Sequence, residues 1–164
     1  MGVNRMKKII SGMIIGIVIG FCLYWIFTHQ VYDEAFYFQD GYEGCAYVVY
    51  NIEGTPQLEI EDDTIQYHFD EDGLVLTTSP EDFGWGGREN SGSHDTKYFY
   101  VNENGEKIKD IPESEIGFVS LGSYSQDGRV QITRMSIPVG NKAKACDEKY
   151  EELEEKLDEK LKNS

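Results

Sequence analysis

The chain has 164 residues and a formal net charge of −15, and 40% of its residues are hydrophobic. All 30 acidic residues, but only 12 of the 15 basic ones, lie after residue 30, so this larger part carries a charge of −18. A surface of that sign repels phosphate backbones, which argues against nucleic-acid binding. It suits cations or a basic protein partner, or it serves solubility alone.

The first predicted element is an apolar stretch at residues 9–27, which contains no charged side chain. As a helix it would be about 28 Å long, enough to cross the hydrocarbon core of a bilayer. The basic tail at residues 1–8 places the N-terminus in the cytoplasm and the rest of the chain outside. The stretch exceeds the apolar region of a signal peptide, and no small-residue cleavage site follows it. We therefore expect an uncleaved, single-pass signal-anchor in the cell membrane.

Three glycines in this stretch, Gly12, Gly16 and Gly20, are spaced four residues apart. This spacing places them on one face of a helix, where a second helix can approach closely. Glycine is also common in membrane helices for no specific reason. The three glycines therefore either pair two membrane spans or have no specific role.

Residues 31–140 consist of short β-rich segments separated by turn residues. Residues 45–52 are β-branched and aromatic on both faces, which predicts a central strand. The Asp-Gly turn near residue 73 predicts a hairpin over residues 65–78, and a second hairpin is predicted over residues 96–111. A third hairpin turn at residues 126–129 precedes the last strand. We expect a mostly β (α+β), antiparallel, extracytoplasmic domain.

Residues 141–164 change to a helical period. Their apolar residues are spaced 4, 3, 4 and 4 apart, which predicts one amphipathic helix. The helix either packs on the sheet, or forms a coiled coil or binds a partner. The apolar stripe consists of Cys146, Tyr150, Leu153, Leu157 and Leu161.

Two cysteines, Cys45 and Cys146, lie outside the apolar stretch, and the third, Cys22, lies within it. An even number of cysteines in an oxidising compartment favours pairing. A bond between Cys45 and Cys146 would attach the C-terminal helix to the first part of the sheet. A buried free cysteine also packs well as a small hydrophobe, so both states remain open.

The sequence contains no catalytic signature. Its three histidines lack a His-Glu-x-x-His motif or a neighbouring cysteine, so we predict no metal site and no cofactor. No Gly-x-Ser-x-Gly motif is present, and we assign no catalytic residue.

The longest irregular segment, residues 79–95, is the best candidate for binding, because loops of this length in compact domains are usually functional or mobile. Its large side chains are of the types that anchor interfaces. Alternatively, its tryptophan fills the core. The candidate partner-binding residues are Trp85, Arg88, His94, Tyr98 and Tyr100.

Residues 41 to about 105 carry a family resemblance. The matching pieces are Gly41-Tyr42-x-Gly44, Tyr50 through Gly54-x-Pro56, Gly73 to Pro80, Phe83-Gly-Trp85, and Tyr98 to Val101 with Gly105. This part resembles a family of small bacterial envelope proteins of Gram-positive type, a domain of unknown function. The resemblance implies an anchored or secreted protein and supplies no activity.

The sequence favours a membrane-anchored extracytoplasmic module that binds a protein or an envelope component. Two alternatives remain: an envelope hydrolase with unidentified catalytic residues, and a small inhibitor or immunity-type membrane protein with a basic partner.

Overall fold

The computed structural model describes residues 12–22, 24, 32–84, 94–126, 130–140, 146, 155 and 159. The strands are β1 (Asp33–Gln39), β2 (Gly44–Tyr50), β3 (Glu59–Glu61), β4 (Thr64–His68), β5 (Leu74–Leu76), β6 (Thr96–Val101), β7 (Lys107–Asp110), β8 (Ser120–Gln126) and β9 (Val130–Val139). A short 3-10 turn, η1, covers Glu113–Glu115.

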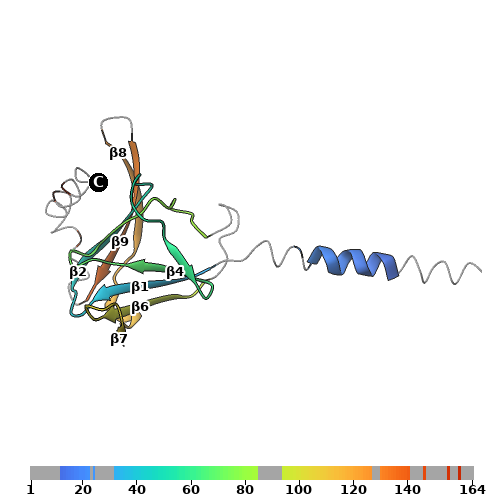
Figure 1. The fold of residues 1–164 in the computed structure, drawn as a ribbon, viewed down its shortest axis with the longest axis horizontal. Coiled ribbons are helices and arrows are strands. Elements are labelled where there is room, and N and C mark those ends of the chain that lie inside the picture. Colours follow the sequence, from blue (N-terminus) through green and yellow to red (C-terminus); the bar gives the residue numbers. More distant parts are fainter. Residues whose placement is uncertain are drawn as a thin grey trace, which may run out of the picture.

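These strands form two sheets that pack against each other (Figure 1). Sheet A has the strand order β3-β4-β1-β6-β7, and sheet B has the order β5-β2-β9-β8. The prediction of a mostly β domain is confirmed. Sequence-distant strands lie side by side in both sheets, since β1 lies between β4 and β6, and β2 lies between β5 and β9.

The core lies between the two sheets and follows the alternation along the strands. On β1, Phe36 and Phe38 point inward and are 2% and 0% exposed, whereas Tyr37 belongs to a separate cluster on the outer face of sheet A. Val48 of β2 joins the core from sheet B. Burying one such side chain stabilises the fold by about 1.5–3 kcal/mol, which fixes the inward face of each strand.

β2 is buried along its whole length. One face contributes to the core between the sheets, and Cys45, Tyr47 and Val49 on the other face pack with Leu74. The predicted central strand, covered on both sides, is confirmed over residues 45–50 of the predicted 45–52, since β2 ends at Tyr50.

The sheets are not antiparallel throughout, which corrects the predicted fold class. β1 runs parallel to both β4 and β6, and β2 runs parallel to β5. Parallel neighbours need long connections, and here the chain crosses to the other sheet and returns before the next parallel strand begins. The hydrophobic pattern of a strand sets its inward face but not the direction of its neighbour.

The predicted hairpin over residues 65–78 is wrong for this reason. β4 remains in sheet A and β5 joins sheet B, so the turn between them carries the chain from one sheet to the other. Gly73 sits in this turn with a φ of +76°, and a Cβ atom there would overlap the ring of Tyr42. The hairpins formed by β6 with β7 and by β8 with β9 are confirmed.

The predicted transmembrane helix at residues 9–27 is also corrected. In the described part of the chain, no helix is both long and apolar enough to cross a membrane. The single-pass signal-anchor, its orientation with the N-terminus inside, and pairing of two spans through Gly12, Gly16 and Gly20 are therefore not supported.

The predicted C-terminal helix at residues 141–164 lies outside the described residues, apart from Cys146 and the exposed helical residues Glu155 and Glu159. Cys146 is bonded to Cys45, and the two Cα atoms are 4.9 Å apart, within the range that a disulfide requires. This bond attaches residue 146 to the outer face of sheet B.

Candidate functional site

The structure describes three of the five candidate partner-binding residues, since Trp85 and Arg88 lie outside the described part. Tyr98 is half-buried and Tyr100 is 7% exposed, and both rings pack with the core between the sheets. His94, two residues before β6, pairs with a buried carboxylate on β1. All three side chains therefore contribute to the interior of the domain.

A buried polar cluster surrounds the beginning of β1. Glu34, which is 9% exposed, accepts a hydrogen bond from the Tyr67 hydroxyl at 3.0 Å through Oε1. Its other oxygen lies 3.2 Å from Nε2 of His94. We call Glu34, Tyr67 and His94 the Glu34 cluster.

Burial dominates the electrostatics of this cluster. Removal from water raises the pKa of Glu34, and the nearby His94 and the hydrogen bonds from Tyr67 and His94 oppose this only in part. Burial likewise raises the pKa of Tyr67 far above its ordinary value, so its hydroxyl keeps its proton and donates to Glu34. A carboxyl with a raised pKa beside a histidine is typical of a general acid. Its small exposure limits contact with a substrate.

Sequence reasoning overlooked Glu34, although a signal was present. Residues 34, 36 and 38 share one face of an alternating strand, and the other two are phenylalanines that enter the core. A carboxylate in line with two core aromatics indicates a buried, partnered acid.

A second feature, open to solvent, lies beyond the carboxyl ends of β1, β4 and β6. Because these three strands are parallel, the turns that follow them meet at one edge of sheet A. Two overlapping cavities of about 570 and 430 Å³ occupy this edge and share Gln39, Glu71 and Glu103. We call them together the acidic groove. Its lining residues are Gln39, Asp40, Asp70, Glu71, Asp72, Val101, Asn102, Glu103 and Asn104.

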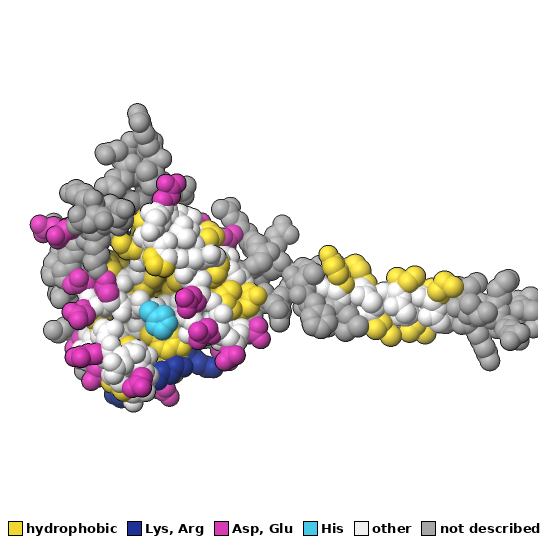
Figure 2. Space-filling model, viewed as in Figure 1, with side chains coloured by type: hydrophobic (Ala, Val, Ile, Leu, Met, Phe, Trp, Pro, Cys, Tyr) yellow, Lys and Arg dark blue, Asp and Glu magenta, His cyan; other side chains and the backbone are white. Residues whose placement is uncertain are grey.

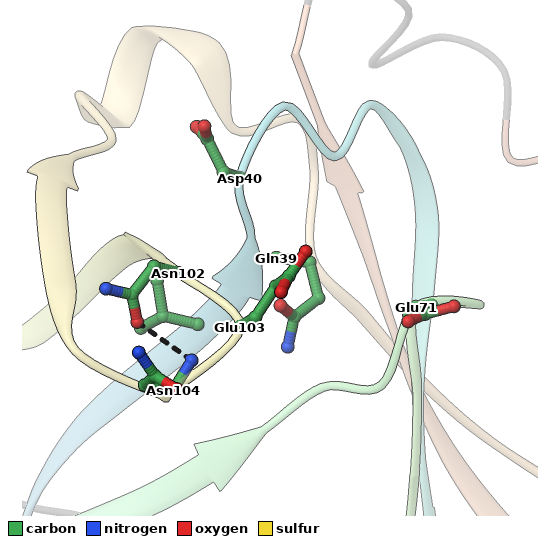
Figure 3. Close-up of a pocket in the computed structure, with 7 residues that line it drawn as sticks. Gln39, Asp40, Glu71, Asn102, Glu103 and Asn104 are labelled. Atoms are coloured by element: carbon green, nitrogen blue, oxygen red, sulfur yellow. Dashed lines mark hydrogen bonds between the residues drawn. The ribbon is translucent and has the colours of Figure 1, made fainter.

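Hydrogen bonds fix the turn after β6, which forms one wall of the groove. Oδ1 of Asn102 accepts a hydrogen bond from the backbone N–H of Asn104 at 3.0 Å (Figure 3). It accepts a second from the backbone N–H of Glu106, also at 3.0 Å. The Asn102 side-chain amide donates to the Glu106 carboxylate at 2.9 Å. The turn is therefore held in shape, with Glu103 at its tip.

The turn after β4, which forms the opposite wall, is fixed in the same way. Oδ1 of Asp70 accepts hydrogen bonds from the backbone N–H groups of Asp72 at 3.0 Å and Leu74 at 2.9 Å. Gln39, at the end of β1, donates to the carbonyl of Phe69 at 3.4 Å. Figure 3 shows that the labelled side chains come from these separate segments of the chain.

The groove is strongly acidic. Five carboxylates line it, and none of its lining residues is Lys or Arg. Figure 2 shows Asp and Glu side chains on the left of the molecule, toward which β1 and β6 point in Figure 1, and also over the middle and right of the visible face. Within the described residues, no group of three His, Cys, Asp or Glu side chains is placed to hold a metal ion. Carboxylates spread in this way suit an extended cation, such as a segment rich in Lys and Arg.

Sequence reasoning treated the groove residues as ordinary turn formers. Each turn was recognised from Asp, Asn and Gly, but their proximity depends on the parallel pairing of β1 with β4 and β6. No single turn carries that information.

Comparisons with known proteins agree with this fold. The model of a family of unknown function, DUF6843, matches residues 30–150. The chain belongs to this family. The match confirms the predicted resemblance and extends it beyond residues 41 to 105 on both sides. No curated protein matches the chain.

Among solved structures, the chain is similar to a crystal structure of a candidate lipoprotein from Bacillus anthracis. The two are 26% identical with a TM-score of 0.57, and the match covers 68% of this chain and 72% of the other. This likeness supports the fold, and neither comparison supplies an activity.

Proposed function

We propose that this protein is an extracytoplasmic module of the cell envelope that binds a basic protein partner through the acidic groove. The observation that carries the proposal is the groove itself, where carboxylates from three turns line one cavity without a lysine or arginine among them. The likeness to a candidate lipoprotein supports the location. The formal charge of −15 would also steer a basic partner toward the molecule.

A defined cationic probe tests this proposal. Binding of a ten-residue oligolysine peptide to the full chain is measured by calorimetry at low and at physiological salt. We expect a triple variant that neutralises the groove to weaken binding about tenfold or more at low salt. Affinity of the unchanged protein falls as salt rises, because ions screen exposed charges. The triple variant is Asp40→Asn, Glu71→Gln and Glu103→Gln.

A control variant separates the groove from the overall charge. It neutralises three exposed carboxylates outside the groove and so changes the net charge by the same amount. Equal weakening by both triple variants would show non-specific attraction and overturn the assignment to the groove. The control substitutions are Glu53→Gln, Glu59→Gln and Glu61→Gln.

A second candidate function, an envelope hydrolase, rests on the Glu34 cluster. Glu34 has the raised pKa of a general acid, with His94 and Tyr67 within hydrogen-bond distance. We expect no hydrolysis of purified cell-wall fragments by the unchanged protein, because Glu34 is 9% exposed. Turnover that Glu34→Gln abolishes would favour this function over binding.

A further inference from the structure

The four edge strands of the two sheets differ in how they are protected. Edge strands expose unpaired backbone groups, and proteins usually guard them with short length, charge or cover. In sheet A, β3 has three residues, Glu59–Glu61, and β7 has four, Lys107–Asp110, of which three are charged. In sheet B, β5 has three residues, Leu74–Leu76, and its first two are buried. All three edges are therefore guarded.

Among the residues that the structure describes, nothing gives the fourth edge, β8, any of these protections. It is seven residues long, and within the described residues its single strand neighbour is β9. Residues 117–126 contain no charged side chain and no proline, in a chain of which 27% is charged. Two large apolar side chains are exposed there, Phe118 at 87% and Leu121 at 60%. Such an edge is suited to pairing with another strand.

The sequence of this edge is nearly symmetric about Leu121. Aromatic residues lie three positions away on either side, at Phe118 and Tyr124, and the positions next to Leu121 hold the small residues Ser120 and Gly122. An interface between two copies related by a two-fold axis must be self-complementary, because residue i meets j while j meets i. In an antiparallel pair centred on Leu121, each Leu121 would meet its counterpart, and position 118 would face position 124.

The charge of the chain also favours a second copy as the partner of β8. Two copies of a chain with a net charge of −15 repel one another, and a stretch without charge is where their surfaces can approach at least cost. A basic partner would gain nothing from this neutral edge, in contrast to the acidic groove.

We propose that residues 118–124, which include the first five residues of β8, pair antiparallel with the same residues of a second copy, centred on Leu121, so that two four-stranded sheets B form one continuous sheet. The groove is built from other strands, so this inference does not rest on the proposed function. Exposed apolar area at Phe118 and Leu121 becomes covered, and the backbone groups at the outer edge of residues 118–124 gain partners.

The mass of the full chain in solution tests the pairing, by sedimentation or light scattering over a range of concentrations. We expect a dimer, and we expect Leu121→Lys to raise its dissociation constant at least about tenfold, because like charges directly opposite each other destabilise a strand pair. The matched control is Ile108→Lys, since Ile108 is 48% exposed on the guarded edge β7. Circular dichroism checks that both variants fold.

Cross-linking tests the register independently of affinity. In a Cys22→Ser background, Leu121→Cys should form a disulfide-linked dimer under mild oxidation, because facing residues in antiparallel strands lie about 4.5–5.5 Å apart. Ile108→Cys should remain unlinked. A monomeric unchanged chain overturns the proposal, even if β8 accepts a strand of another protein. Equal loss of dimer in Leu121→Lys and Ile108→Lys overturns it too.

Discussion

Removal of the Cys45–Cys146 bond should lower the stability of the domain substantially. The bond joins residues 101 positions apart and connects the outer face of β2 to residue 146. In the chain-entropy model, a loop of about 100 residues gives up to about 4.7 kcal/mol, and real bridges often give less. For a domain of this size that upper limit corresponds to roughly 10–20 °C in Tm.

The assay is thermal unfolding followed by circular dichroism in a Cys22→Ser background, with and without the double substitution Cys45→Ala and Cys146→Ala. Cys146→Ala alone is the informative control, because Cys146 is half-buried and Cys45 is 1% exposed. If the cross-link is the cause, this single variant loses nearly as much stability as the double one. A double variant that melts within about 2 °C of its background would refute the reasoning, since the entropy model predicts several times that change.

Two further predictions concern buried groups and turns. Burial raises the pKa of Glu34, so charging this group opposes folding as pH rises above its ordinary value of 4.5. Glu34→Gln should therefore flatten the fall in unfolding free energy above that pH, measured by urea titration, and an unchanged slope would contradict the assignment. Gly73→Ala should cost more than Gly105→Ala, because both have positive φ, near 76° and 79°, but only at Gly73 does a Cβ meet the ring of Tyr42. Gly105→Ala should lose about 1–2 kcal/mol of unfolding free energy in the same titration, and equal losses would refute the steric argument.

Local sequence patterns predicted the positions of the strands better than they predicted which strands pair with one another. The apolar run at residues 45–52 identified a strand covered on both sides, because a strand buried on both faces is apolar at nearly every position of one short segment. The turn near Gly73 was also predicted, but the sheet that the next strand joins was not. An Asp-Gly turn can close a hairpin or lead the chain to another sheet, as it does here. The direction of a neighbouring strand is decided by segments far away in the chain.

The prediction of a membrane span at residues 9–27 was wrong. The composition and length of this stretch predicted a span, whereas no helix of the described residues is both long and apolar enough to cross a membrane.

The candidate site was predicted in part. Residues 79–95 drew attention because large side chains occur in a long loop, and His94 does reach a buried partner, Glu34. Tyr98 and Tyr100 were selected for their type and proximity, but their places in β6 turn them toward the core. Residue type indicates what a side chain can bind, and strand register decides what it reaches.

The acidic groove follows from topology more than from any one residue. Asp and Asn are common in turns because their side chains bond to nearby backbone groups, as Asp70 and Asn102 do here. In an antiparallel meander, successive turns alternate between opposite ends of the sheet, and their charges stay apart. Here β1, β4 and β6 run in one direction, so three turns share one edge. Carboxylates that line one groove act together on a cation bound in it, which is why the test of the groove neutralises three of them at once.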